Sequence, residues 1–374
     1  MAFSLTRPTR LAAAALLALG LAACGSDSNG PSQPAPFDAA GTSADIQAMA
    51  GSFDSDVLNS FIGVGAGIDS VASGAASFAI AAVKAGPEAA RTGSFSNASA
   101  YAHAVAKLLP RTAAPGLSLS GGAIPDSAVG KTYVYDSDVQ HYVASDRAGA
   151  PANGVRFILY AVGLDGQPAL PLNEIGYADL TDESTATSRA GHLVVVSGAT
   201  TYLDYKVTGT GSATGGSVNI EGFVSNGTVR ADFNLANAIK LTETSLDITV
   251  DYSVSLPDRD ASLTFTEVIS ENDSGSQVTL NLTMKGPHGE VSIKGDITST
   301  GETISGNFTV RVNGEVYATI TPGSDGTTLD GSGRTLTDDE QTALANVFNS
   351  VNGVLGVFTA LLSPVGNWIG AYSA

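Results

Sequence analysis

Cysteine, tryptophan and histidine are scarce in this chain, whose 374 residues include one Cys, one Trp and four His. A single cysteine excludes a disulfide within the chain and a structural zinc site built on several thiolates. Positive charge is scarce too, because 18 Lys and Arg stand against 36 Asp and Glu and give a net charge of −18. Nucleic-acid binding relies on cations that displace phosphate counterions, so we expect no nucleic-acid partner.

The four histidines show none of the spacings that metal-binding or catalytic motifs require. No two of them lie three or four positions apart, no H-E-x-x-H occurs, and no G-x-S-x-G marks a hydrolase nucleophile. We therefore expect no metal site and no cofactor. His141 alternates with Val139 and Val143, which predicts a buried histidine on the apolar face of a strand. The acid pair Asp182-Glu183 is interpreted as turn chemistry.

The N-terminus has the order of parts found in a secretion signal. Arg7 and Arg10 make a positive start, and residues 11–21 form an apolar stretch of Ala and Leu. This stretch is shorter than the roughly 20 residues that a membrane span needs. It ends in Leu21-Ala22-Ala23-Cys24, which resembles the lipobox of bacterial lipoprotein precursors, and Cys24 is the single cysteine of the chain.

The resemblance has consequences for location and partners. It implies that residues 1–23 are a signal peptide and that Cys24 becomes a lipidated first residue, carrying acyl chains such as palmitate. In lipoproteins of this kind an Asp directly after the cysteine often signals retention in the inner membrane. Gly25 stands there, so we expect a cell-envelope protein anchored to the outer membrane through lipid at Cys24.

Three segments precede the strand-rich part of the chain. Residues 24–44 are rich in Ser, Pro, Gly and Asn and predict a flexible tether. Residues 45–112 are rich in alanine and predict helices, and residues 113–130 predict a linker. Ser55 or Asp54 is the expected cap of a second helix. The apolar stripe of this region consists of Ile46, Met49, Phe53, Val57, Phe61, Val64, Ile68 and Val71.

From residue 131 to residue 336 the apolar period changes from helical spacing to two. Runs such as Ile248, Val250, Tyr252 and Val254 alternate with polar residues. Asn226-Gly227 and Asn313-Gly314 separate alternating runs, and Asn-Gly is a strong signal for a tight hairpin. We expect roughly eleven to thirteen strands. They should form an antiparallel sheet with one apolar and one polar face.

Residues 337–374 return to helical spacing. Thr337 and Glu340 fit a capping box, in which each side chain satisfies a backbone N–H of the other. The helix they begin carries a long apolar stripe, which consists of Leu344, Val347, Phe348, Val351, Val354, Leu355, Phe358, Leu361 and Leu362.

Together these parts predict an α+β protein. We expect a large antiparallel curved sheet or partial barrel, with Ala-rich N-terminal helices and the C-terminal amphipathic helix covering its apolar face. A non-enzymatic binding or structural role follows. A hydrophobic ligand or a segment of an envelope protein would bind between sheet and helix, in a pocket formed by Leu344, Phe348, Val351, Leu355 and Phe358.

Two alternatives stay open. The helices, with Phe53, Phe61 and Phe78, would pack the apolar face completely and leave no pocket. The protein would otherwise be a hydrolase whose catalytic residues come from separate loops and leave no local motif. A histidine with a serine and an acid within hydrogen-bond reach would support that second alternative.

Overall fold

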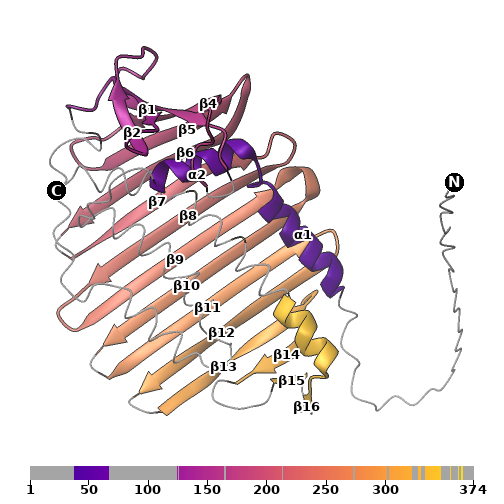
Figure 1. Cartoon of the computed structure of the whole chain (residues 1–374). Coiled ribbons are helices and arrows are strands. Elements are labelled where there is room, and N and C mark those ends of the chain that lie inside the picture. The colour runs from indigo at the N-terminus through magenta and orange to yellow at the C-terminus, as the bar shows by residue number, and fades with distance from the viewer. Residues whose placement is uncertain are drawn as a thin grey trace, which may run out of the picture. The chain divides into compact units, whose positions relative to one another are not determined.

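The computed structural model describes residues 38–66, 124, 126–163, 166–212, 214–272, 274–300, 303–321, 327–329, 333–346, 354, 361 and 364, all within one compact unit, Pro34–Ala374 (Figure 1). Within these residues no helix has both the length and the apolar character needed to cross a bilayer.

The described residues form one large sheet, two N-terminal helices and the first part of a C-terminal helix (Figure 1). The N-terminal helices are α1 (Ala39–Gly51) and α2 (Asp56–Ala66), and a 3-10 turn, η1 (Pro257–Arg259), connects two strands. The first strands are β1 (Thr132–Asp136), β2 (His141–Ser145), β3 (Gly154–Tyr160), β4 (Glu174–Asp182), β5 (Arg189–Ser197), β6 (Thr200–Ser212), β7 (Gly215–Ser225) and β8 (Arg230–Leu241). The others are β9 (Ser245–Leu256), β10 (Ala261–Asn272), β11 (Gly275–Gly286), β12 (Gly289–Thr300), β13 (Thr303–Val312), β14 (Glu315–Ile320), β15 (Thr327–Leu329) and β16 (Arg334–Thr335).

The sheet is antiparallel along almost its whole length, as the sequence predicts. From β3 to β16 each strand pairs with the next, and the order ends in β3-β1-β2. One pairing departs from the prediction, because β1 runs parallel to β3. The described part of the chain contains 16 strands rather than eleven to thirteen. The surplus comes from short strands such as β15 and β16, which are too short to show an alternating pattern.

The hairpin at Asn313-Gly314 confirms the turn prediction. β13 ends at Val312 and β14 begins at Glu315, so these two residues are the whole loop. Asn313 has φ 50° and Gly314 has φ 85°. Positive φ at both central positions matches the right-handed twist of the paired strands, and Asn and Gly adopt it at the lowest cost.

Alternation gives the sheet an apolar inner face. Two rows of buried residues cross it, each built from residues directly opposite one another on neighbouring strands. One row consists of Phe233, Val254, Leu263, Met284, Val291 and Val312, and Gly222 on β7 separates Phe233 from the buried Tyr205 on β6. The other consists of Ile220, Leu235, Tyr252, Phe265, Leu282, Ile293 and Val310. Burying each such side chain contributes about 1.5–3 kcal/mol before entropy is counted.

Helix α1 crosses four strands on this face. Asp45 in its middle meets His288 in the β11–β12 turn, and the carbonyl of Gly51 at its end accepts a bond from Asn226 in the β7–β8 turn. The start of α1 at Ala39, capped by Asp38, lies inside the segment expected to be tether.

Helix α2 packs on the neighbouring strands β3 to β6 (Figure 1). The Ser55 hydroxyl accepts the N–H of Leu58, which confirms the predicted cap. Gly63 lies so near the β3–β4 loop that a Cβ atom there would be 2.9 Å from the carbonyl oxygen of Gly166. The glycine thus allows close packing. Most of the predicted N-terminal stripe is buried, namely Ile46, Met49, Phe53, Val57, Phe61 and Val64.

The C-terminal helix begins as the sequence predicts. Residues 338–346 are helical; the Thr337 N–H donates to Glu340 at 2.8 Å, and the Glu340 N–H donates to the Thr337 hydroxyl at 3.4 Å. Both halves of the capping box are therefore present. Leu344, Val354 and Leu361 are buried and belong to the same core cluster as the inner face of the sheet.

Candidate functional site

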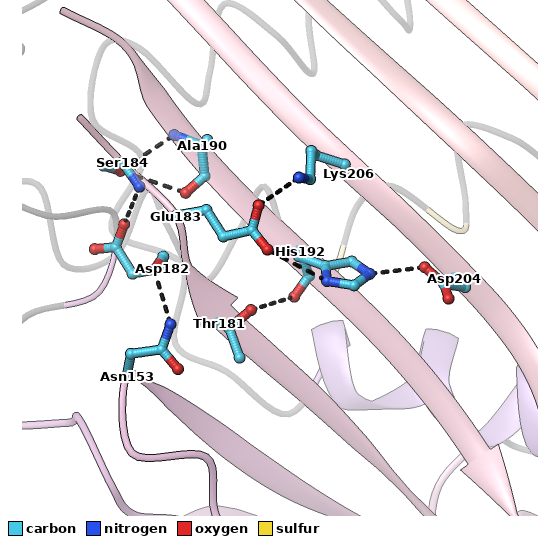
Figure 2. A network of polar contacts seen from close by, with 9 residues as sticks. All are labelled: Asn153, Thr181, Asp182, Glu183, Ser184, Ala190, His192, Asp204 and Lys206. Carbon is cyan, nitrogen blue, oxygen red and sulfur yellow. Dashed lines mark hydrogen bonds and ion pairs between the residues drawn. The ribbon is translucent and has the colours of Figure 1, made fainter.

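A cluster of four charged or titratable side chains lies on the outer, polar face of β5 and β6. We call it the outer cluster; it consists of Glu183, His192, Asp204 and Lys206 (Figure 2). His192 on β5 lies directly opposite Lys206 on β6, and Asp204 is two residues before Lys206, so the three share one face. Glu183 follows the end of β4 and reaches across from the next strand.

His192 lies between two carboxylates in the outer cluster. Its Nε2 is 2.7 Å from Asp204 Oδ1, and its Nδ1 is 3.5 Å from Glu183 Oε1. The other oxygen of Glu183 is 2.5 Å from Lys206 Nζ. The Lys206 ammonium holds the pKa of Glu183 below its usual range, with His192 adding to the effect, and Glu183 in turn raises the pKa of Lys206.

This arrangement does not suit acid–base catalysis on a nucleophile. A histidine that takes a proton from serine needs one ring nitrogen facing that hydroxyl, whereas both nitrogens of His192 face carboxylates. The hydroxyl of nearby Ser184 bonds to the backbone of Ala190 instead (Figure 2). The two carboxylates lie on opposite sides of the ring and cannot share one ion with it. No group of metal-ligating side chains occurs within the described residues.

The outer cluster is best explained as an ion-pair network that ties the β4–β5 turn to the sheet. Asp182, next to Glu183, accepts the N–H of Ser184 through its side chain and a bond from Asn153 through its carbonyl (Figure 2). The acid pair at 182–183 therefore has the turn role that the sequence predicts. Each member of the outer cluster is about a third exposed or more, which limits the energy of its pairs to the modest values of surface salt bridges.

The prediction for His141 is wrong. The residue is exposed and its Nδ1 lies 3.0 Å from the carbonyl oxygen of Val139, while Tyr142 is the buried member of the strand. The alternation predicts the wrong face because it counts Val139 as part of the strand. Val139 is in the turn before β2 and is 51% exposed.

A second polar cluster lies on the inner, apolar face of the sheet. We call it the inner cluster; it consists of Asn237 on β8, Tyr252 on β9 and Glu267 on β10, which are 3%, 4% and 1% exposed. Asn237 and Glu267 both lie opposite Val250, one on each side of β9. Tyr252 is two residues along β9 from Val250 and faces the same way. Its ring stacks on Phe265 with a centroid distance of 5.9 Å.

The inner cluster has the properties of a polar site in an apolar surrounding. Burial raises the pKa of the Tyr252 hydroxyl far above its ordinary value, and the charge of Glu267 adds to this rise, while a hydrogen bond with Asn237 opposes it. Among the described residues, Asn237 Oδ1 has no hydrogen-bond partner. A buried acceptor without a donor costs about 1–3 kcal/mol.

The structure describes only some of the sequence-predicted site residues. Of the predicted pocket, Leu344 is buried in the core, while Phe348, Val351, Leu355 and Phe358 lie outside the described residues. Cys24 lies outside them too.

The inner cluster was missed by sequence reasoning, although a signal existed. Leu263, Phe265 and Ile269 alternate on the inward side of β10, which places the carboxylate of Glu267 at an inward position. Asn237 interrupts the corresponding pattern of β8 in the same way, after Phe233 and Leu235.

No protein-family model, curated protein or solved structure matches this chain.

Proposed function

We propose that the protein is a non-enzymatic lipoprotein of the bacterial outer membrane, anchored through Cys24. We also propose that the apolar face of its sheet holds a hydrophobic ligand or a hydrophobic segment of an envelope protein. The apolar face carries this proposal. Its two buried rows continue from strand to strand as far as β13, one from β7 and the other from β8, farther than either α1 or α2 reaches. Apolar surfaces with a few convergent polar groups are the usual form of small-molecule sites.

The C-terminal stripe is the second part of the proposed site. Leu344, Val354 and Leu361 share a core cluster with the sheet, which supports a helix that lies over the apolar face. We keep the sequence-based pocket, which consists of Leu344, Phe348, Val351, Leu355 and Phe358, as the helix side of the site.

The anchor rests on the N-terminal signal. The order of positive residues, apolar stretch and Leu21-Ala22-Ala23-Cys24 supports a lipid at the single cysteine. An anchored protein with an apolar site is suited to holding molecules that water does not dissolve. The hydrolase alternative gains no support from the outer cluster, because both ring nitrogens of His192 face carboxylates.

Ligand titration tests the proposal. The purified full chain is mixed with N-phenyl-1-naphthylamine, whose fluorescence rises in apolar surroundings, and the bound dye is then displaced with a fatty acid, a fatty alcohol or a phospholipid. We expect saturable binding and displacement at micromolar concentrations. A folded protein that neither binds the dye nor any of these lipids would leave only a structural role for the apolar face.

A further inference from the structure

The inner cluster places hydrogen-bond acceptors in the middle of the apolar face. Asn237 and Glu267 lie on either side of β9, so their backbones are two strand spacings apart, about 9.5 Å. Both side chains point to the same side of the sheet as Val250. A carboxamide oxygen, a carboxylate and the Tyr252 phenol therefore converge on one small area.

The fold accounts for only part of the Asn237 side chain. This residue is 3% exposed, and among the described residues its Oδ1 accepts no hydrogen bond. The amide of Asn237 also bonds with the Tyr252 hydroxyl, so replacing Asn237 alone would leave that hydroxyl without this partner, whereas replacing Asn237 by Leu and Tyr252 by Phe together would be neutral or stabilising. The unpaired Oδ1 therefore carries a desolvation cost that the fold does not require, and it is the atom to which a donor from outside the fold would bind.

We infer that the inner cluster binds the headgroup of a long-chain amphiphile that carries O–H or N–H donors, such as a fatty alcohol or a long-chain amine. The inference rests on the proposed function, since it names the class of ligand that the apolar face holds. Asn237 Oδ1 accepts from the headgroup, and the chain lies along the apolar rows beside it.

The chemistry of the cluster also discriminates against fatty acids. An ionised carboxylate headgroup has no donor for Asn237 Oδ1, so this buried acceptor stays unpaired when a fatty acid binds. The wild-type protein therefore discriminates against a ligand without a donor, because the Asn237 Oδ1 acceptor is left unpaired when that ligand binds.

Competition among three ligands of equal chain length tests the inference. Dodecanol, dodecylamine and dodecanoate each displace N-phenyl-1-naphthylamine from the full chain. We expect dodecanol and dodecylamine to bind about tenfold more tightly than dodecanoate, the size of one buried hydrogen bond.

Asn237→Leu should abolish this preference while dodecanoate binding stays the same or improves. The melting temperature of the unliganded double variant, Asn237→Leu with Tyr252→Phe, should equal or exceed that of the wild type, because both partners of the buried bond are then replaced by apolar groups. Thr132→Val is the matched control, because it removes another buried polar group that has no partner among the described residues, but on β1 and outside the two apolar rows. It should leave the preference unchanged.

The outcomes separate the two proposals. Equal binding of all three ligands, or a preference that survives Asn237→Leu, overturns the headgroup site and leaves the hydrophobic site standing. A double variant, Asn237→Leu with Tyr252→Phe, that melts lower than the wild type or fails to fold also overturns it, because the polar groups of the inner cluster are then needed by the fold itself. Absence of binding by every ligand overturns the proposed function itself.

Discussion

Asn237 and Glu267 face each other across Val250 on the apolar side of the sheet, one from β8 and one from β10. Both are almost fully buried, among rows of valine, leucine, isoleucine and aromatic residues. The outer cluster, by contrast, lies at the water-facing surface, where the cost of charge is small and partners are satisfied. The two clusters therefore differ in kind, and only the inner one has an energetic reason to bind a ligand.

Replacement of Cys24 tests the membrane anchor. Cys24→Ser removes the thiol that would carry the lipid, so the protein should move from the membrane to the soluble periplasmic fraction. Membrane fractionation with immunoblotting measures this. A variant that sediments with membranes as fully as the wild type contradicts the lipoprotein proposal.

Removal of the C-terminal segment tests its part in the core. Truncation after Arg334 deletes Leu336, Leu344, Val354 and Leu361, all of which are buried. The exposed apolar face should cause aggregation or a loss of cooperative melting. The single change Leu344→Ala should lower the free energy of unfolding by about 2–5 kcal/mol. Thr342→Ala at an exposed position of the same helix should change it by less than about 0.5 kcal/mol. Unaltered melting of the truncated protein would contradict this role.

The capping box gives a sharper test of the same helix. Thr337→Ala removes the hydroxyl that accepts the Glu340 N–H, and should cost about 0.5–2 kcal/mol of stability, whereas Thr337→Ser should cost little. The bond from Arg334 lowers the pKa of Glu340 to about 2. Because the pKa of Glu340 is depressed in the folded protein, its carboxylate stabilises the fold fully at pH values above the pKa that Glu340 has in the unfolded chain. This stabilisation is lost as the pH falls towards 2. Chemical denaturation at several pH values measures both effects. Equal stability of the Thr337→Ala and Thr337→Ser variants would contradict the role of the Thr337 hydroxyl.

The contact between α1 and the β11–β12 turn should depend on pH. His288 Nδ1 lies 2.9 Å from Asp45 Oδ2, and the pKa of His288 is raised by this bond, with Asp45's charge and then Asp38 adding to it. The contact therefore stabilises the fold fully at pH values below the ordinary histidine pKa. This stabilisation is lost as the pH rises through the raised pKa of His288. Protection of α1 amides from hydrogen exchange should fall over that range.

Asp45→Asn is the control for that contact. It should bring the His288 pKa back towards its ordinary value and remove the pH dependence of α1 protection. A pH dependence that is the same in the variant and the wild type would show that another group is responsible.

Local signals explain which parts of the fold were predictable. Asn313-Gly314 has the residues that a two-residue turn demands, and Thr337 and Glu340 have the spacing of a capping box, so both were readable along the chain. The parallel pairing of β1 with β3 was not, because no residue in Thr132–Asp136 encodes its neighbour. His141 shows the same limit, since a turn residue was counted into the alternation of a short strand.

By itself, the sequence determined that this is a sheet with one apolar face. Apolar residues at every second position of a strand all point to the same face, and that face must be buried. It also determined where most of the N-terminal stripe and the C-terminal cap lie, since these depend on neighbours within one helical turn. Only the tertiary structure decided that Asn237, Tyr252 and Glu267 meet, because their meeting depends on the register of three strands. A shift of one residue in either pairing would turn a partner to the outer face, and no local pattern specifies that alignment.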